Sequence, residues 1–310
     1  MENRILGIHH ITAIAGNAKR NFDFYTKVLG LRLVKKTVNF DDPGTYHFYF
    51  GDEVGTPGTI LTFFPWDRVK QGRAGAGMAT DVAFSVPAGS LEFWKDRFEQ
   101  QNVGITATGV RFGDPFISFV DPDGLALTLI VPKTDDRKGW SAGEVNDLVA
   151  IKGFHSTTLT LRSKTATAKV LTDVLGYYLS EEEGSTTRYK TDAVATASIV
   201  DIIETHEAPD SINAGGTIHH VAFRVKDEET LMAYRKKVQA HGLQITEKID
   251  RNYFFSLYFR EPGGVLFEIA TDSPGFAVDE AVDQLGSNLK LPPQYESYRE
   301  KIEEALPVLD

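Results

Sequence analysis

The chain has no cysteine among its 310 residues. This absence excludes disulfide bonds, a thiolate nucleophile and the cysteine-rich kind of zinc site, so any metal ion must be held by His, Asp or Glu. Long apolar runs are also absent, since no stretch approaches the roughly 18–20 residues that a membrane helix needs. The opening residues, MENRILGIHH, lack the apolar core of a signal peptide. We therefore expect a cytoplasmic protein that has no membrane partner.

Basic residues are fewer than acidic ones: 33 Lys and Arg residues against 43 Asp and Glu residues give a net charge of −10. Nucleic-acid binding normally depends on a basic patch, so no nucleic-acid partner is expected. The phosphate-binding patterns GxxxxGK[ST] and GxGxxG are missing as well. The composition, 42% hydrophobic and 25% charged, is ordinary for a globular protein. The length suggests two domains of about 150 residues.

An internal repeat divides the chain. ATDVAFSV at 79–86 aligns with IHHVAFRV at 218–225, and DPDGLALTLI at 121–130 aligns with EPGGVLFEIA at 261–270, with offsets of 139 and 140. Two anchors with nearly the same offset indicate a duplication. We predict a first domain at 1–135, a linker at 136–150 that continues the polar stretch TDDRKG, a second domain at 151–275, and a partly helical tail at 276–310.

A finer repeat indicates four βαβββ modules. GIHH at 7–10 resembles GFHS at 153–156, and each opens a strand-like run that is followed by an amphipathic helix ending in Leu-Gly. Further helices fit 91–101 and 228–241. The modules start near residues 5, 78, 151 and 216, which predicts an α+β fold.

Four such modules, two in each of two tandem domains, resemble the vicinal oxygen chelate superfamily over residues 5–275. Its members include glyoxalase I, bleomycin- and fosfomycin-resistance proteins and extradiol ring-cleaving dioxygenases. The resemblance implies that paired modules curl their sheets around a cavity. It also implies that the first strand of each module, and the last strand of some, supply metal ligands.

The alternation of strand side chains selects the residues that face this cavity. In IHHVAFRV the apolar phase is Val221, Phe223 and Val225, which leaves His220 for the cavity. The same phase in the other first strands gives His10 with Thr12, then Asp81 and Ser156. The repeat-equivalent positions in the last strands are Glu268 and Thr128.

One set of ligand positions is chemically strong and the other is weak. His10, His220 and Glu268 form the two-histidine, one-carboxylate set of non-haem Fe(II) oxygenases, which leaves metal positions open for substrate and oxygen. Asp81, Ser156 and Thr128 are too poor in ligands for a transition metal. We therefore predict that the first module pairs with the fourth. His155 is the alternative ligand, although it shares the apolar phase unless a bulge turns it.

Residues 257–268, LYFREPGGVLFE, match the signature of extradiol dioxygenases. Tyr258 lies ten residues before Glu268, and the intervening EPGG turn predicts a hairpin that brings both into one cavity. The chain departs from the signature at Arg251, where those enzymes carry an acid–base histidine. Arginine stays protonated, so it cannot shuttle a proton, but it can stabilise an oxyanion.

This departure and the segments GIHHITAIAG, GFHSTTL and IHHVAF resemble the hydroquinone-cleaving dioxygenases. The resemblance implies Fe(II) as the cofactor and the triad above as its ligands. It implies catalytic roles for five surrounding residues: His9, Thr12, His219, Arg251 and Tyr258. Strict alternation turns His9 and His219 away from the metal.

The predicted function is Fe(II)-dependent cleavage of a small hydroquinone-type aromatic ring by O₂. Two alternatives stay open. One is a glyoxalase-type lyase or isomerase, although such sites usually carry four protein ligands, often two of them Glu. The other is a non-catalytic protein that binds quinones or drugs. The amphipathic stretch YESYREKIEEAL in the tail either covers the core or mediates self-association into a homo-oligomer.

Overall fold

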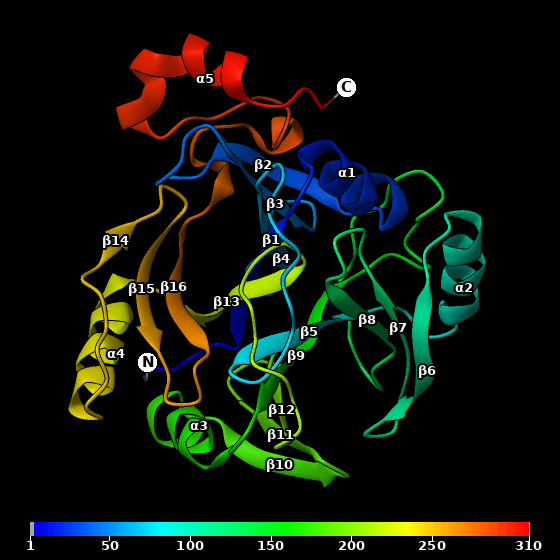
Figure 1. The fold of residues 1–310 in the computed structure, drawn as a ribbon, viewed down its shortest axis with the longest axis vertical. Helices are drawn as coiled ribbons and strands as arrows, with labels where there is room; N and C mark the ends of the chain where they lie inside the picture. The colour runs from blue at the N-terminus through cyan, green and yellow to red at the C-terminus, as the bar shows by residue number, and fades with distance from the viewer. Residues whose placement is uncertain (1–2, 310) are drawn as a thin grey trace.

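The computed structural model describes residues 3–309 and contains two curled eight-stranded sheets (Figure 1). The first sheet has the strand order β14-β15-β16-β13-β1-β4-β3-β2. It combines the first module with the fourth. Its strands are β1 (Ile8–Ala15), β2 (Arg32–Val38), β3 (Tyr46–Gly51), β4 (Ile60–Pro65), β13 (Thr217–Val225), β14 (Ile249–Asp250), β15 (Phe254–Arg260) and β16 (Leu266–Pro274).

The second sheet combines the second and third modules in the order β10-β11-β12-β9-β5-β8-β7-β6. In each sheet the first strands of the two modules pair antiparallel at the centre, β1 with β13 and β5 with β9. The predicted pairing of the first module with the fourth is therefore confirmed. The strands are β5 (Met78–Ser85), β6 (Ile105–Arg111), β7 (Asp114–Val120), β8 (Ala126–Ile130), β9 (Gly153–Leu161), β10 (Tyr178–Glu183), β11 (Thr186–Lys190) and β12 (Ile199–Glu204).

Each module contributes one helical segment after its first strand. In the first and third modules a short α-helix continues into a π-helical turn, which the sequence did not predict. These segments end as expected at Gly30 and Gly176, whose positive φ angles of 69° and 75° favour glycine. The segments are α1 (Ala18–Asp23) with η1 (Phe24–Val28), α2 (Leu91–Gln100), α3 (Thr165–Lys169) with η2 (Val170–Val174), and α4 (Glu228–Ala240).

The core lies on the helix-covered faces of the sheets. Val221, Phe223 and Val225 on β13 are fully buried, and α4 contacts β13, β15 and β16 on that side (Figure 1). Alternation then presents His220 and Ala222 to the concave face. The apolar phase of the first strand thus positions the polar residues that form the site.

The tail after β16 lies over the end of the first sheet that carries β2. It contains three 3₁₀ segments, η3 (Phe276–Val278), η4 (Val282–Gln284) and η5 (Pro293–Tyr298), and then α5 (Arg299–Ala305), at the top of Figure 1. The fully buried Lys35 on β2 anchors the tail, because its Nζ lies 2.6 Å from Asp279 and 2.5 Å from Glu280. This ion-paired contact fixes the tail to the sheet.

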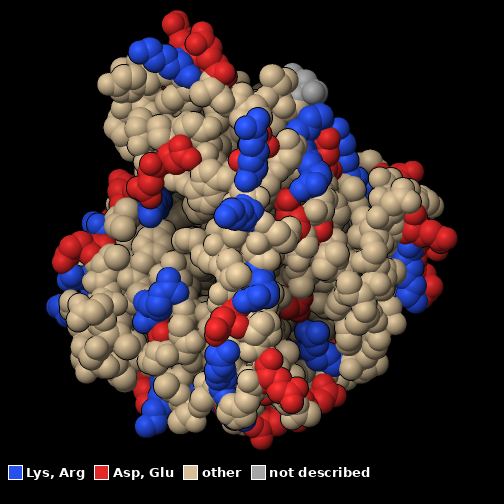
Figure 2. Space-filling model, viewed as in Figure 1, with Lys and Arg blue, Asp and Glu red and all other residues tan. Residues whose placement is uncertain are grey.

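Charge of both signs covers the face shown in Figure 2. Within residues 3–309 no helix is long and apolar enough to span a membrane. Figure 2 shows acidic and basic side chains interspersed over the same face.

Candidate metal centre and its cavity

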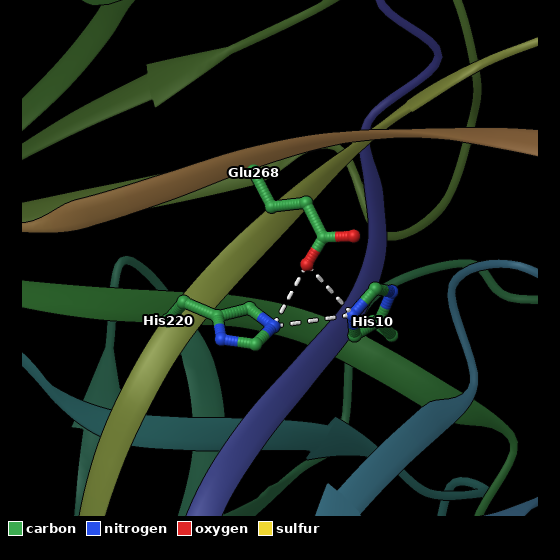
Figure 3. Close-up of side chains that lie close together, drawn as sticks. All are labelled: His10, His220 and Glu268. Carbon is green, nitrogen blue, oxygen red and sulfur yellow. Dashed lines mark hydrogen bonds and ion pairs between the residues drawn. The ribbon is translucent and has the colours of Figure 1, made fainter. Parts of the chain in front are cut away.

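Three neighbouring strands bring His10, His220 and Glu268 together on the concave face of the first sheet. Ala222 on β13 pairs with His10 on β1 and with Glu268 on β16, and His220 pairs with Thr12 one step along. Glu268 Oε2 lies 2.8 Å from His220 Nε2 and 3.2 Å from His10 Nε2, and the two nitrogens are 3.3 Å apart (Figure 3). All three side chains are buried.

The Glu268 carboxylate has one satisfied oxygen and one orphan. Its Oε1 accepts a hydrogen bond from Ser256, whereas the buried Oε2 receives none despite the two nearby imidazole nitrogens. Burial alone would raise the pKa of this carboxyl, but His10 and His220 hold its pKa well below the ordinary value. A buried anionic oxygen without a donor is costly, and a cation held among these three atoms would compensate its charge.

The neighbouring histidine fixes the tautomer of His10. His9 Nε2 lies 3.1 Å from the carbonyl oxygen of Thr271, which can only accept, so Nε2 carries a hydrogen. Burial and the neighbouring His10 lower the pKa of His9, which keeps its ring neutral and leaves Nδ1 as an acceptor. The His10 Nδ1–H then donates to His9 Nδ1 over 2.9 Å. In the neutral form of His10 this hydrogen bond places the lone pair on Nε2, the atom that lies 3.2 Å from the Glu268 carboxylate.

The second His-His pair repeats this arrangement. His219 Nδ1 lies 2.8 Å from His220 Nδ1. Burial, reinforced by His220, lowers the pKa of His219 to about 3, so its ring is neutral as well. With its Nδ1 engaged, His220 directs Nε2 toward Glu268. Such outer hydrogen bonds orient imidazoles around metal ions.

These features fit a divalent metal ion. One ligand atom from each of His10, His220 and Glu268 lies within 4.8 Å of the others, and this is the only such group among residues 3–309. Neutral imidazoles and an ionised carboxylate are the protonation states that a metal ion requires. Two histidines and one carboxylate leave coordination positions free for other ligands.

A cavity of about 310 Å³ opens beside the triad, with His10 and His220 in its wall. That volume suits a small organic ligand. Aromatic side chains form much of the lining, namely Phe40, Phe64, Trp66 and Phe254. A flat apolar ring can therefore be buried against these walls while its polar groups reach the triad.

Arg251 and Tyr258 form a polar pair on the same cavity wall. Tyr258 is directly paired with Glu268 across the predicted hairpin, and its ring centroid lies 5.6 Å from that of His220. The Nε of Arg251 donates to the Tyr258 hydroxyl over 3.3 Å. Burial and the Glu268 anion raise the pKa of Tyr258, so it remains a phenol. The pair offers the cavity a fixed positive charge and a hydroxyl.

Strict alternation was wrong at His219, which lines the cavity. The pairing of β1 with β13 skips His9 and His219, so each is the extra residue of a β-bulge. His219 lines the cavity together with Thr12, whereas His9 contacts His10 from behind. A bulge therefore lets consecutive histidines lie on the same side of a strand and share a hydrogen bond.

The second sheet carries the repeat-equivalent residues in a different state. The Asp81 carboxylate accepts from Thr128 Oγ1 at 3.0 Å and pairs with Arg111 at 3.3 Å. His155 also lies at a bulge, but its Nδ1 contacts Ser156 Oγ at 3.0 Å. An arginine thus already compensates the carboxylate, and His155 belongs to no ligand group within the described residues.

Two polar residues of β3 that line the cavity, His47 and Tyr49, were not among the predicted site residues. In the segment YHFYFG, Phe48 and Phe50 are fully buried in the core. Alternation therefore turns His47 and Tyr49 toward the concave face. The same pattern that selected the triad, applied to a middle strand, would have found them.

Comparison with known proteins places the chain in a family. It belongs to the Glyoxalase/Bleomycin resistance protein/Dioxygenase superfamily, whose model matches residues 7–129 and 153–269. The chain is 45% identical over 306 residues to "Putative ring-cleaving dioxygenase MhqO" of Bacillus subtilis, covering 99% of this chain and 97% of the relative. It is 35% identical over 309 residues to the chlorohydroquinone/hydroquinone 1,2-dioxygenase of Sphingobium indicum, covering 97% and 96%.

Solved structures support the same assignment. A crystal structure of a Bacillus subtilis protein, 44% identical, superposes with a TM-score of 0.95 and covers 99% of this chain and 98% of that one. Glyoxalase I from Zea mays shares the fold alone, with a TM-score of 0.62 at 16% identity over 87% of this chain and 92% of that one. The predicted fold of four modules in two curled sheets is confirmed.

Proposed function

We propose that this chain is an Fe(II)-dependent dioxygenase that uses O₂ to cleave the ring of hydroquinone-type compounds. The observation that carries the proposal is the orphan oxygen of Glu268, which lies 3.2 Å from His10 Nε2 and 2.8 Å from His220 Nε2 beside a cavity of small-molecule size. Relatives named for ring cleavage and for hydroquinone support the substrate class.

When bound to the triad, the metal ion would supply a common binding centre for a ring hydroxyl and O₂. The residues around the cavity would bind the ring and stabilise the charge that develops during the reaction. Phe40, Phe64 and Phe254 hold the ring and exclude water. Arg251 provides charge-assisted hydrogen bonds to negative charge that develops on oxygen, and the Tyr258 hydroxyl orients the same oxygen. Tyr258 lies on β15 of the hairpin before Glu268, and Arg251 lies in the turn between β14 and β15, so both groups are in place before substrate binds.

Oxygen uptake by protein loaded with Fe(II) in the absence of air tests this proposal. With hydroquinone, the wild type should consume O₂ and open the ring. Glu268→Gln should lose both metal and activity, because an amide cannot supply the anionic ligand. Asp81→Asn, the matched change in the second sheet, should keep both. Turnover of a hemithioacetal without oxygen uptake would instead support a glyoxalase-type reaction.

A further inference from the structure

A row of hydrogen-bonded side chains crosses three neighbouring strands on the cavity wall. Thr12 Oγ1 on β1 lies 3.0 Å from Thr62 Oγ1 on β4. Thr62 Oγ1 lies 2.9 Å from His47 Nε2 on β3, and His47 Nδ1 lies 3.0 Å from the Tyr49 hydroxyl. Thr12, His47 and Tyr49 line the cavity, whereas Thr62 is fully buried beneath it.

The chemistry of these groups allows two arrangements in which the hydrogen bonds run in one direction along the whole row. Each hydroxyl has one hydrogen, and burial keeps His47 neutral by lowering its pKa, so its ring has one N–H. If Tyr49 donates to His47, then His47 donates to Thr62, Thr62 donates to Thr12, and Thr12 is free to donate into the cavity. In the reverse arrangement every donor becomes an acceptor. The two arrangements differ by the passage of one proton from end to end.

The proposed reaction needs such a path, because ring hydroxyls must lose protons and Arg251 cannot accept one. His47 is the only imidazole in the described cavity lining outside the two His-His pairs. The rim carboxylate of Asp42 is already engaged, since it accepts from Trp66 Nε1 at 2.8 Å and from Thr45 at 2.7 Å. Its neighbour Asp41 is exposed to solvent.

We propose that the row formed by Tyr49, His47, Thr62 and Thr12 relays a proton from the ring hydroxyl remote from the triad to the triad end of the cavity. This inference rests on the proposed function. The relay supplies the proton shuttle that is missing at Arg251. It makes Tyr49 and Thr12, at the two ends of the row, catalytic residues, and His47 and Thr62, which act through them, positioning residues.

The relay conserves atoms and charge. The hydroxyl O–H bond breaks and its proton bonds to the Tyr49 oxygen, while the hydrogen of Tyr49 moves to His47 Nδ1. The hydrogen on His47 Nε2 moves to Thr62, and that of Thr62 moves to Thr12. Thr12 releases its own hydrogen to a reacting oxygen at the triad end. No electron is transferred. In the emptied cavity, water gives one proton to Thr12 and takes one from Tyr49, and this return passage restores the first arrangement.

Thr62→Val tests the relay, because it removes the central hydroxyl at nearly constant volume and leaves His47 and Tyr49 in the cavity. With hydroquinone and iron-loaded enzyme, kcat should fall roughly 10²-fold, the usual size of a lost proton-transfer step. Metal content and the anaerobic affinity for hydroquinone should stay the same, and the solvent deuterium isotope effect on kcat should rise. Thr62→Ser should recover most of the rate, because it restores the hydroxyl.

The second sheet offers a matched control. Thr80 and Thr160 form a similar pair at 2.8 Å, and Thr160→Val should leave kcat and the isotope effect unchanged. A wild-type kcat and isotope effect in Thr62→Val, alongside normal wild-type turnover, would overturn the relay alone. No turnover of any diol by the iron-loaded wild type would overturn the proposed function, and the relay with it.

Discussion

Each His-His dipeptide divides two tasks between adjacent side chains. The second histidine directs Nε2 at the Glu268 carboxylate, and its Nδ1 shares a hydrogen bond with Nδ1 of the first. His9 is itself fixed by the carbonyl group of Thr271. Hydrogen bonds within the protein therefore orient the proposed ligands, whether or not a metal ion is bound.

His9→Phe should weaken metal binding about 10- to 100-fold, the usual effect of losing such an outer hydrogen bond. The change keeps a ring of similar size but leaves the His10 Nδ1–H without its acceptor. Competition with a chelator under anaerobic conditions would measure the affinity. His155→Phe, at the repeat-equivalent bulge, is the control and should bind metal like the wild type. Equal affinity in both variants would contradict the assignment.

Arg251 is the residue that separates this cavity from the extradiol signature. Arg251→Ala should lower kcat for hydroquinone about 10²–10³-fold, because a preorganised donor to the oxyanion is lost. Metal content should be unchanged, since Arg251 is not a ligand. Arg251→Lys should recover only part of the rate, because lysine keeps the charge but not the planar fork. Undiminished turnover in Arg251→Ala would show that its charge does not act on the reaction.

At the scale of strands and helices, the sequence predicted most of what positions the site. Alternation in IHHVAFRV selected His220, and the repeat offset carried this phase to His10 and Glu268. The bulges were not predictable in the same way. A bulge depends on how β1 pairs with β13, about 200 residues away, and neither strand carries a local signal for the extra residue.

The middle strands show a different kind of omission. His47 and Tyr49 alternate with Phe48 and Phe50, so their orientation was available from the sequence. They were missed because the search was confined to the first and last strands, where the resemblance implies ligands. The hydrogen bonds that connect them to Thr62 cross from β3 to β4, and only the folded sheet brings those side chains into contact.

At the scale of the whole molecule, the four modules form two sheets whose concave faces carry different polar residues. In the first sheet a carboxylate and two imidazoles face one another without a compensating cation from the chain. In the second sheet Arg111, the equivalent of Arg251 at an offset of 140, pairs directly with Asp81. The duplication therefore retains one candidate metal site and replaces the other with an internal ion pair.

The central claim, that the triad cavity supports ring cleavage by O₂, is tested most directly with isotopically labelled oxygen. Iron-loaded protein would be supplied with hydroquinone under ¹⁸O₂, and the product would be analysed by mass spectrometry. The account predicts a ring-opened product that contains both ¹⁸O atoms. An intact ring, or an opened ring whose added oxygen comes only from water, would contradict it.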